Sequence, residues 1–408
     1  MKIIGPFKQI ITLRGLPLKG AVEDAALEIV ANGAVLIDNN KIVEVGGFEH
    51  LIKAYPNIAI EAVEPNQVLL PGFIDCHTHA CFGGSRANDF ALRIAGKTYL
   101  EIAQSGGGIW NSVVNTRELT ESQLFDLTQQ RVNRFLKEGI TTLEIKSGYG
   151  LSVEQELKML RVINQIGQKC ATTIVPTCLA AHLKPKDFEG SSEAYLEYLV
   201  QCLFPVLKAE NLCKRIDIFI EKSAFGLGES RQYLAAAKAQ GFDICVHADQ
   251  FTAGSADLAV AMEAVSADHL EASQDQQIAA LAKSETVAVV LPGASLGLGE
   301  PFAPARKLLD GGACVAIASD YNPGSAPMGD LLMQASVLAC FQKLSTAEVF
   351  AGLTFRAAAA LRLSNYGKIE ASFYADMQAY CCNDYREILY QQGKLKPNKV
   401  WKHGKLVK

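Results

Sequence analysis

The sequence lacks the long apolar runs and the blocks of like charge that mark several classes of protein. Its longest apolar stretches, such as Val287–Leu291 and Cys314–Ala318, fall far short of the roughly 20 residues that a membrane-spanning helix needs. The first residues, Met1–Pro6, contain no apolar signal core with a small-residue cleavage site. The net charge is −4 and no basic cluster occurs, so we expect no nucleic-acid partner and no membrane partner.

The cysteine pattern of a disulfide-bonded protein is also missing. The 11 cysteines are an odd number, no Cys-x-x-Cys pair occurs, and Cys245 and Cys314 lie inside strand-like apolar runs. This usage is typical of buried free thiols in a reducing compartment. We therefore expect a cytoplasmic protein whose cysteines serve packing.

The chain is long enough for one large domain with a small appendage, since 408 residues exceed the roughly 100–200 of an ordinary core. Short alternating runs occur at both ends. Near the start, Ala34–Ile37 and Ile42–Val45 flank a polar turn and predict a β-hairpin. Near the end, residues 375–381 and 399–407 show the same alternation in short runs. We expect the two ends, 1–66 and 367–408, to form one small β-sandwich domain together.

Between these ends, strand-like apolar runs alternate with helical patterns such as Val153–Ile166 and Tyr195–Lys208. This alternation is typical of βα units around a parallel sheet. The eight runs are Val68–Asp75, Thr141–Lys146, Thr172–Leu179, Ile216–Ile220, Phe242–His247, Ala264–His269, Val287–Leu291 and Cys314–Asp320. They predict an α/β fold, a (β/α)8 TIM-type barrel over residues 67–366, with catalytic groups at the C-terminal ends of its strands.

Most histidines fall where these strands end. The chain has seven, and five lie at or just beyond strand ends: His77, His79, His182, His247 and His269. A single histidine there is more often structural than a ligand, but side chains two apart on a strand point to the same face. His77 and His79 can therefore enter the barrel mouth together, and imidazole is a common zinc ligand. The other two, His50 and His403, are expected at the surface of the terminal domain.

Three further strands add groups to this pair. His247 ends the fifth strand, His269 the sixth and Asp320 the eighth. A metal held by His77, His79, His247 and Asp320 would leave a position open for water, which is the mark of a catalytic site. Asp320 could move the proton of that water to a leaving nitrogen. His269 could orient the nucleophile or stabilise developing charge.

Loop residues after the strands are suited to binding a substrate. Arg86 can hold a carboxylate with two hydrogen bonds, although a surface arginine is more often solvated. Tyr149 follows the second strand, His182 follows the third, and the loop Asn322–Ser325 offers an amide, a hydroxyl and bare backbone N–H groups.

Two carboxylates beside the strand-end histidines have a plainer interpretation. Asp249 lies two residues after His247, and Asp268 directly precedes His269. Helix capping, or support of a neighbouring imidazole, fits them at least as well as a direct role.

Together, these residues resemble the amidohydrolase superfamily, whose pattern is His-x-His on strand one, His on strands five and six, and Asp on strand eight. Its members share the barrel, often with a small β-sandwich made from both termini. The likeness runs from about residue 30 to the C-terminus. Six segments together resemble the imidazolonepropionase family: Pro71–His79, Phe82–Arg86, Glu144–Gly150, His247–Asp249, Ala267–Leu270 and Asp320–Ser325. The first is shared widely across the superfamily, whereas the loops that carry Arg86, Tyr149 and Asn322 are much more specific.

The resemblance implies a hydrolase acting on the cyclic C–N bond of 4-imidazolone-5-propanoate, which yields N-formimidoyl-L-glutamate in L-histidine degradation. It implies one zinc or iron ion per chain, held by His77, His79, His247 and Asp320. It implies substrate contacts from Arg86, Tyr149, His182, Asn322, Gly324 and Ser325. The propionate of this substrate is a group that Arg86 can pair with.

One position departs from the family pattern. Many members have Glu three residues after the fifth-strand histidine, where this chain has Gln250. An amide cannot shuttle a proton but can hydrogen-bond the substrate ring. Proton transfer then falls to Asp320, His269 or a substrate group. A second metal would need a bridging carboxylated lysine at strand four, and Lys222 near that end is expected to be solvated.

Two rival interpretations stay open. A purine or pyrimidine deaminase would use the same metal centre but would leave Arg86 without a carboxylate partner. A non-enzymatic barrel scaffold would have lost its metal, and the filled ligand positions argue against it. For the oligomeric state, a homodimer is only the commonest default.

Overall fold

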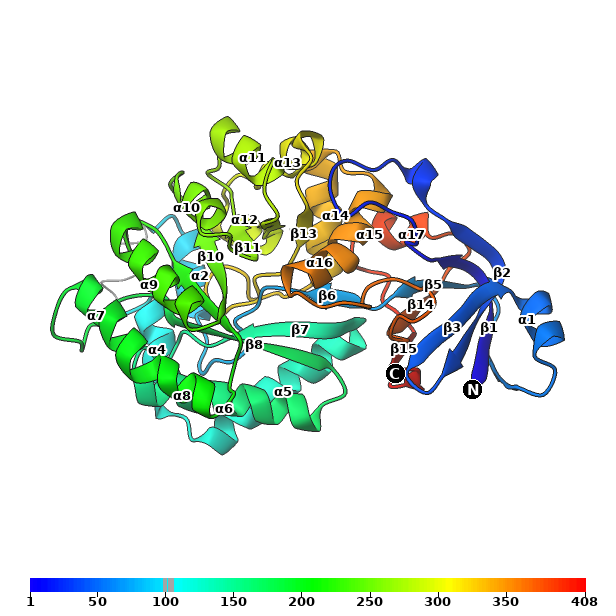
Figure 1. Cartoon of the computed structure of the whole chain (residues 1–408), viewed down its shortest axis with the longest axis horizontal. Helices are drawn as coiled ribbons and strands as arrows, with labels where there is room; N and C mark the ends of the chain where they lie inside the picture. The colour runs from blue at the N-terminus through cyan, green and yellow to red at the C-terminus, as the bar shows by residue number, and fades with distance from the viewer. Residues whose placement is uncertain (98–100, 102–105) are drawn as a thin grey trace.

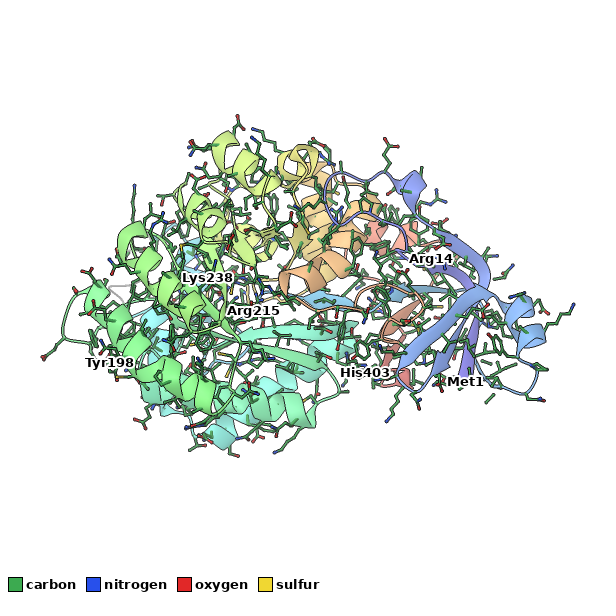
Figure 2. The ribbon with its side chains drawn as sticks, viewed as in Figure 1. Met1, Arg14, Tyr198, Arg215, Lys238 and His403 are labelled. Carbon is green, nitrogen blue, oxygen red and sulfur yellow. The ribbon has the colours of Figure 1, made fainter. Side chains whose placement is uncertain are left out.

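The chain folds into a barrel with a smaller sheet beside it. Figure 1 shows the computed structural model, which describes residues 1–97, 101 and 106–408. Helices surround the barrel, and both chain ends lie at the smaller sheet, which we call the terminal sheet. Side chains fill the interior of both parts, with Met1 and His403 at the terminal sheet and Tyr198 at the far end of the barrel (Figure 2).

The barrel is an eight-stranded parallel sheet in the order of the chain. Its strands are β6 (Phe73–Asp75), β7 (Ile140–Lys146), β8 (Thr173–Ala181), β9 (Arg215–Phe219), β10 (Asp243–Ala248), β11 (Ser266–His269), β12 (Val287–Val290) and β13 (Val315–Ile317). Both faces of these strands are covered, which explains why they appear in the sequence as continuous apolar runs. The ring closes just beyond β6 and β13, where Thr78 and Tyr321 form a parallel bridge. The predicted TIM-type barrel is therefore confirmed.

Helices follow most of the strands along the chain. They are α2 (Ala87–Ile94), α4 (Ile109–Glu118), α5 (Glu121–Lys137), α6 (Val153–Lys169), α7 (Ser192–Tyr198), η2 (Leu199–Leu203), α8 (Phe204–Ala209), α9 (Leu227–Ala239), α10 (Ser255–Ala261), α11 (Asp275–Ala282), α12 (Pro292–Leu298), α13 (Ala305–Gly311), α14 (Leu331–Gln342), α15 (Thr346–Gly352) and α16 (Phe355–Ala360). The start of α5 is fixed by a capping box, in which Thr120 and Gln123 bond each other's backbone N–H groups. Its buried stripe then repeats every three to four residues.

The helix expected over Tyr195–Lys208 is interrupted. It consists of α7, the π-helical turn η2 and α8. Pro205, near the start of α8, has no backbone N–H to donate to the preceding turn, and the wider π turn precedes it. The helix expected over Val153–Ile166 is confirmed as α6, with Ser152 accepting the N–H of Gln155 at its start.

The terminal sheet combines strands from both chain ends. Its strands are β1 (Lys2–Ile11), β2 (Ile29–Asp38), β3 (Lys41–Gly47), β4 (Ala59–Ala62), β5 (Gln67–Pro71), β14 (Met377–Cys381), β15 (Lys399–Lys402) and β16 (Lys405–Leu406), with η1 (Asp24–Ala26), α1 (Phe48–Ala54) and α17 (Arg386–Tyr390) in its connections. The predicted hairpin is confirmed as β2 and β3, in which Asp38 faces Lys41. Antiparallel pairing of β5 with β14 joins the two ends of the chain.

The strand expected over Val68–Asp75 is two strands in two sheets, and that expectation was wrong. The chain leaves the terminal sheet after β5 and enters the barrel with β6. Gly72 lies between them, where a Cβ atom would come within 2.3 Å of Oγ1 of Thr141. Only glycine fits this approach without a shift. The limits of the two domains stay a prediction.

Several smaller expectations can be compared with the structure. The cysteines are free, and seven are buried, but Cys202, Cys340 and Cys381 are exposed rather than packed inside. His50 is exposed as expected, whereas His403 is half-buried against Asp376. Lys222 is exposed, in line with a solvated lysine. Among the described residues, no helix combines the length and the apolar composition needed to cross a membrane.

Candidate active site

A cavity of about 680 Å³ opens at the C-terminal ends of the barrel strands. Eleven of the twelve residues expected in the site line it: His79, Arg86, Tyr149, His182, His247, Gln250, His269, Asp320, Asn322, Gly324 and Ser325. The twelfth, His77, is fully buried beside them. The structure therefore gathers residues from six strand ends that the sequence predicted to meet.

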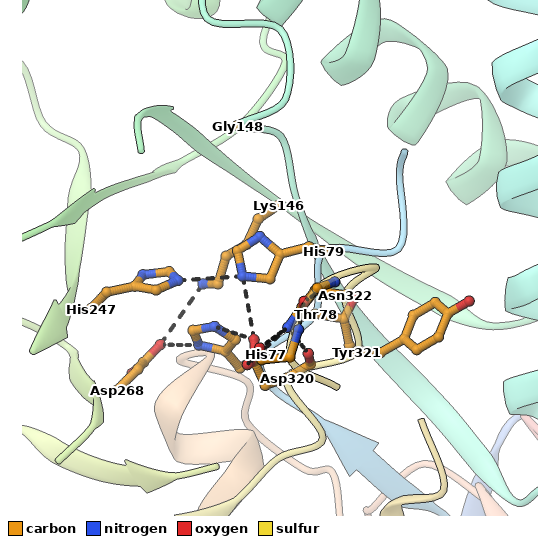
Figure 3. Close-up of polar contacts among 12 residues, drawn as sticks. His77, Thr78, His79, Lys146, Gly148, His247, Asp268, Asp320, Tyr321 and Asn322 are labelled. Atoms are coloured by element: carbon orange, nitrogen blue, oxygen red, sulfur yellow. Dashed lines mark hydrogen bonds and ion pairs between the residues drawn. The ribbon is translucent and has the colours of Figure 1, made fainter. Parts of the chain in front are cut away.

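Three imidazoles and one carboxylate form the core of this site (Figure 3). Nε2 of His79 lies 3.4 Å from Nε2 of His247. Oδ1 of Asp320 lies 3.5 Å from Nε2 of His77 and 3.5 Å from Nε2 of His79. In a tetrahedral site with metal–ligand bonds of about 2.1 Å, the ligand atoms are about 3.4 Å apart. These three distances match that spacing. Possible ligand atoms within 4.8 Å of one another form two groups that share His77, one with His79 and His247 and one with His269 and Asp320.

The unused nitrogen of His77 also fits a metal. Its Nε2 is buried without a hydrogen-bond partner among the described residues, while its Nδ1 lies 2.6 Å from Oδ2 of Asp268. A carboxylate at Nδ1 fixes the proton there and leaves a lone pair on Nε2. Asp217 lies in the same relation to His247, 3.1 Å from its Nδ1.

Burial keeps these imidazoles neutral. It lowers the pKa of His77 well below its usual value and that of His247 to about 4, although Asp217 opposes the effect at His247. Neutral imidazole is the form that binds metal. For Asp320, burial alone would raise the pKa, but hydrogen bonding to His79 and the charge of His269 lower it. The carboxylate therefore stays ionised.

The barrel seam places Asp320 opposite the histidine pair. The N–H of Asp320 donates to the carbonyl of His77, and the N–H of His79 donates to the carbonyl of Tyr321. Asp320 has a φ of 51° and His269 a φ of 86°, both in the left-handed region that non-glycine residues rarely adopt. Such strain is common at functional sites.

His269 faces a carboxylate that the sequence did not indicate. Its Nδ1 lies 3.5 Å from Oε2 of Glu271. Burial alone would lower the pKa of His269, but the charges of Glu271 and Asp320 raise it above its usual value. This favours a protonated ring that can donate a hydrogen bond into the cavity.

Beneath the imidazoles lies Lys146, which the sequence had placed at the end of the second strand without a role of its own. Its Nζ is 2.8 Å from Oδ2 of Asp217 and 2.9 Å from Oε1 of Glu144. Burial alone would lower the pKa of Lys146, but these carboxylates raise it well above its usual value. The charged pattern Glu144-x-Lys146 on one strand face was the signal that could have revealed an ionic group inside the barrel.

Asp249 and Asp268 have the supporting roles that the sequence suggested, helix capping and contact with an imidazole. Asp268 supports the imidazole of His77, as described above. Oδ1 of Asp249 accepts the N–H groups of Gly254, Ser255 and Ala256 and thereby caps the start of α10.

Arg86 is fixed at the cavity wall and is not solvated. Its Nε donates to Oδ2 of Asp89, which also accepts the N–H of Gly108. Only 8% of Arg86 is exposed. Its Nη1 lies against the backbone of Gly324, which, like Arg86, lines the cavity.

Tyr149 and His182 form the neighbouring wall. Glu156 accepts the N–H groups of Gly148, Gly150 and Leu151, which fixes the loop that carries Tyr149. Nδ1 of His182 lies 3.0 Å from the carbonyl oxygen of Gly148 and therefore donates to it. Its Nε2 is left as an acceptor.

Asn322 is used mainly to shape its own loop. Its Oδ1 accepts the N–H groups of Gly324 and Ser325, and its Nδ2 donates to Oδ2 of Asp320 at 2.9 Å. This holds the second oxygen of Asp320 away from the histidines. A direct contact of Asn322 with substrate stays a prediction.

The cavity has further lining residues that the sequence did not suggest: Arg93, Lys97, Ile109, Leu183, Phe219, Ser223, Phe251, Leu298 and Glu300. Arg93 follows Arg86 by seven residues, which is two helical turns, so the face of α2 could have indicated it. Its Nη1 donates to the carbonyl of Gly297 at 2.8 Å. Most of the others lie on connections without a motif of their own.

Comparison with known sequences gives consistent matches. The model of the amidohydrolase family matches residues 68–407. An imidazolonepropionase from Fusobacterium nucleatum is 38% identical over 403 residues, which cover 98% of this chain and 97% of that protein. An imidazolonepropionase from Acinetobacter baumannii is 41% identical over 340 residues, covering 83% and 85%.

Solved structures show the same fold at lower identity. An adenosine deaminase from Xanthomonas campestris with bound zinc has a TM-score of 0.70 at 18% identity, covering 99% of this chain and 92% of that one. A zinc complex of an atrazine chlorohydrolase from Arthrobacter aurescens has a TM-score of 0.71 at 14% identity, covering 100% and 95%.

Proposed function

This chain belongs to the amidohydrolase family and, within it, to the imidazolonepropionases, and from this premise we propose the reaction that its cavity performs. It hydrolyses the cyclic C–N bond of 4-imidazolone-5-propanoate to N-formimidoyl-L-glutamate, a step of L-histidine degradation. The observation that carries the proposal is the presence, in one cavity, of a metal-spaced cluster and a buried arginine. The free cysteines support a cytoplasmic location.

One zinc or iron ion would be held by Nε2 of His77, His79 and His247 and by Oδ1 of Asp320. The spacing of these atoms and the unpartnered Nε2 of His77 support this set. When bound, such an ion lowers the pKa of a water and polarises the substrate carbonyl. Three imidazoles with one carboxylate accept either metal.

Arg86 binds and orients the substrate through its propionate. Its Nε is occupied by Asp89, so the Nη atoms are the donors for the carboxylate. The acceptor Nε2 of His182 suits a ring N–H, and the phenol of Tyr149 offers a further hydrogen bond. Burial raises the pKa of Tyr149, so the phenol keeps its proton.

The protein's own groups move the proton. Water adds to the ring carbonyl, the C–N bond to the ring nitrogen breaks, and that nitrogen gains a proton. Asp320 takes the proton from water and delivers it to the leaving nitrogen. His269, whose pKa is raised, donates a hydrogen bond to the developing oxyanion. Gln250 lines the cavity as an amide and contacts the ring without carrying a proton.

A deaminase of purines or pyrimidines is the alternative that shares this metal set. Its substrates carry no carboxylate, so a buried Arg86 held by Asp89 would have no partner in the complex. Asp89 balances the charge of Arg86, but the buried Nη donors would lack an acceptor, which is unfavourable and favours the carboxylate-bearing substrate.

The test is direct turnover. Metal-loaded protein is mixed with 4-imidazolone-5-propanoate, and the loss of the ring absorbance is followed with and without a chelator. We expect rapid loss of absorbance, inhibition by the chelator, recovery with zinc or iron, and one ion per chain by elemental analysis. Absence of turnover by metal-loaded protein contradicts the substrate assignment, and a metal content far below one ion per chain contradicts the metal site.

A further inference from the structure

Lys146 is a buried cation at which three carboxylates meet. Its Nζ lies 2.8 Å from Asp217, 2.9 Å from Glu144 and 3.8 Å from Asp268. All four side chains are almost completely excluded from solvent. Lys146 is not among the residues that line the cavity, and its ion pairs within the described structure are with these three carboxylates.

Each carboxylate contacts a different part of the cluster. Oδ2 of Asp268 lies 2.6 Å from Nδ1 of His77, and Oδ2 of Asp217 lies 3.1 Å from Nδ1 of His247. Figure 3 shows Asp268 between His77 and Lys146. One ammonium group is therefore linked to two of the three imidazoles through a single carboxylate each.

The third carboxylate reaches the backbone between the histidine pair. Oε2 of Glu144 accepts the N–H of Thr78 at 3.0 Å, and the carbonyl of Glu144 accepts the Thr78 hydroxyl at 2.6 Å. Thr78 stands between His77 and His79, so this contact fixes the direction in which both side chains leave the backbone.

Without a cation, three carboxylates so close together inside a barrel would repel one another and move apart or take up protons. Arg215, on β9, is another buried cation and is labelled near the centre of the barrel in Figure 2. No ion pair of Arg215 within 4.0 Å is found among the described residues. The direct contacts that gather the three carboxylates are thus those of Lys146.

We propose that Lys146 is a positioning residue of the metal site, whose charge holds Asp217, Asp268 and Glu144 where they orient His247, His77 and the His77–His79 backbone. The inference rests on the proposed metal site but assigns a role to a residue that touches neither metal nor substrate. Groups that orient metal-binding imidazoles typically change metal affinity by about 10–100-fold when they are removed.

The test compares two buried lysines. Lys146→Met keeps much of the side-chain volume and removes the charge. Lys402→Met is the matched control, because Lys402 is also buried and pairs with Asp376 in the terminal sheet, away from the cluster. Zinc affinity is measured by competition with a chelator, and thermal unfolding of the metal-free proteins is measured in parallel.

We expect Lys146→Met to bind zinc about 10–100-fold more weakly than the unchanged protein. Lys402→Met should unfold at a lower temperature with unchanged zinc affinity. The visible absorption of the cobalt-loaded proteins should differ from wild type for Lys146→Met alone. In turnover, kcat should fall while KM stays close to wild type, since Lys146 does not line the cavity.

The proposal is overturned if Lys146→Met loses stability but keeps wild-type zinc affinity and the wild-type cobalt spectrum. If Lys146→Met does not fold, Lys146→Met/Asp268→Asn removes one charge of each sign and is compared with Asp268→Asn. The double variant should bind zinc about tenfold more weakly, because Asp217 still loses its cation, and equal affinities overturn the proposal. Failure of the unchanged protein to bind zinc would instead contradict the proposed metal site.

Discussion

Nη1 of Arg86 lies against Gly324, and a Cβ atom at that glycine would stand 2.2 Å from it. The φ of Gly324 is not in the left-handed region, so an alanine there would strain no backbone angle. A side chain at this position would therefore conflict with the guanidinium, which would have to shift, and not with the turn.

Gly324→Ala should displace Arg86 and weaken its hold on the substrate carboxylate. We expect KM to rise by about 10–100-fold, the scale for displacing a positioning group by about 1 Å. Steady-state kinetics measure this. Gly228→Ala in α9 is the control, because nothing lies within 4 Å of the added atom. An unchanged KM in Gly324→Ala would show that Arg86 does not bind the carboxylate.

Arg86→Ala separates the proposed substrate from that of a deaminase. It should reduce substrate binding by about 2–5 kcal/mol, the scale for truncating one partner of a buried charge pair. Arg161→Ala, at an exposed pair with Glu210, should leave kinetics unchanged. A KM of Arg86→Ala equal to wild type would favour a substrate without a carboxylate.

Substitution of Asp320 should change kcat, whereas substitution of Gln250 should mainly change KM. Asp320→Asn should lower kcat by about 10²–10⁴-fold, since the group that moves the proton is lost together with a metal ligand. Gln250→Ala should raise KM and leave kcat within about tenfold, because an amide carries no proton. Single-turnover measurements distinguish the two effects. A collapse of kcat in Gln250→Ala with the metal retained would assign Gln250 a part in the chemistry.

Glu348 should make stability depend on pH. Its carboxylate accepts hydrogen bonds from two nitrogens of Arg306 and from the N–H groups of Val22 and Ser345. Burial alone would raise the pKa of Glu348, but Arg306 and the backbone donors lower it below its usual 4.5. A lowered folded-state pKa stabilises the fold above about pH 4.5 and loses that effect as the pH falls through the lowered value.

Glu348→Gln should therefore reduce the free energy of unfolding by about 1–3 kcal/mol near neutral pH. Below about pH 4, the difference from wild type should shrink, because wild-type Glu348 is then protonated as well. Urea unfolding at several pH values measures this. Glu118→Gln, at an exposed position, is the control. A difference between Glu348→Gln and wild type that is the same at pH 7 and at the lowest pH would contradict the argument.

Much of the barrel could be predicted because its strands are buried on both faces and stand out as apolar runs. The same rule failed over Val68–Asp75, where two buried strands follow each other and periodicity does not show that Gly72 directs them into different sheets. Tertiary contact with Thr141 decides that point, and no local pattern carries it.

The site residues could be predicted where a strand end carries an unusual side chain, as at His247 and Asp320. The groups that support them could not. Lys146 and Glu156 stand within apolar or helical patterns, and their importance depends on which strands and loops surround them in space. Sequence spacing therefore indicates possible metal ligands more readily than the residues that hold those ligands in place.

The bridge between Thr78 and Tyr321 closes the barrel directly beside the candidate metal site. His77 and His79 lie on one side of this seam and Asp320 on the other, so the proposed ion would link the first and last strands of the barrel. The proposed site is complete only when the segments after β6 and β13 have come together, and separation of these segments would break it. Binding of such an ion would therefore stabilise the closed barrel, and its removal should lower the temperature at which the protein unfolds.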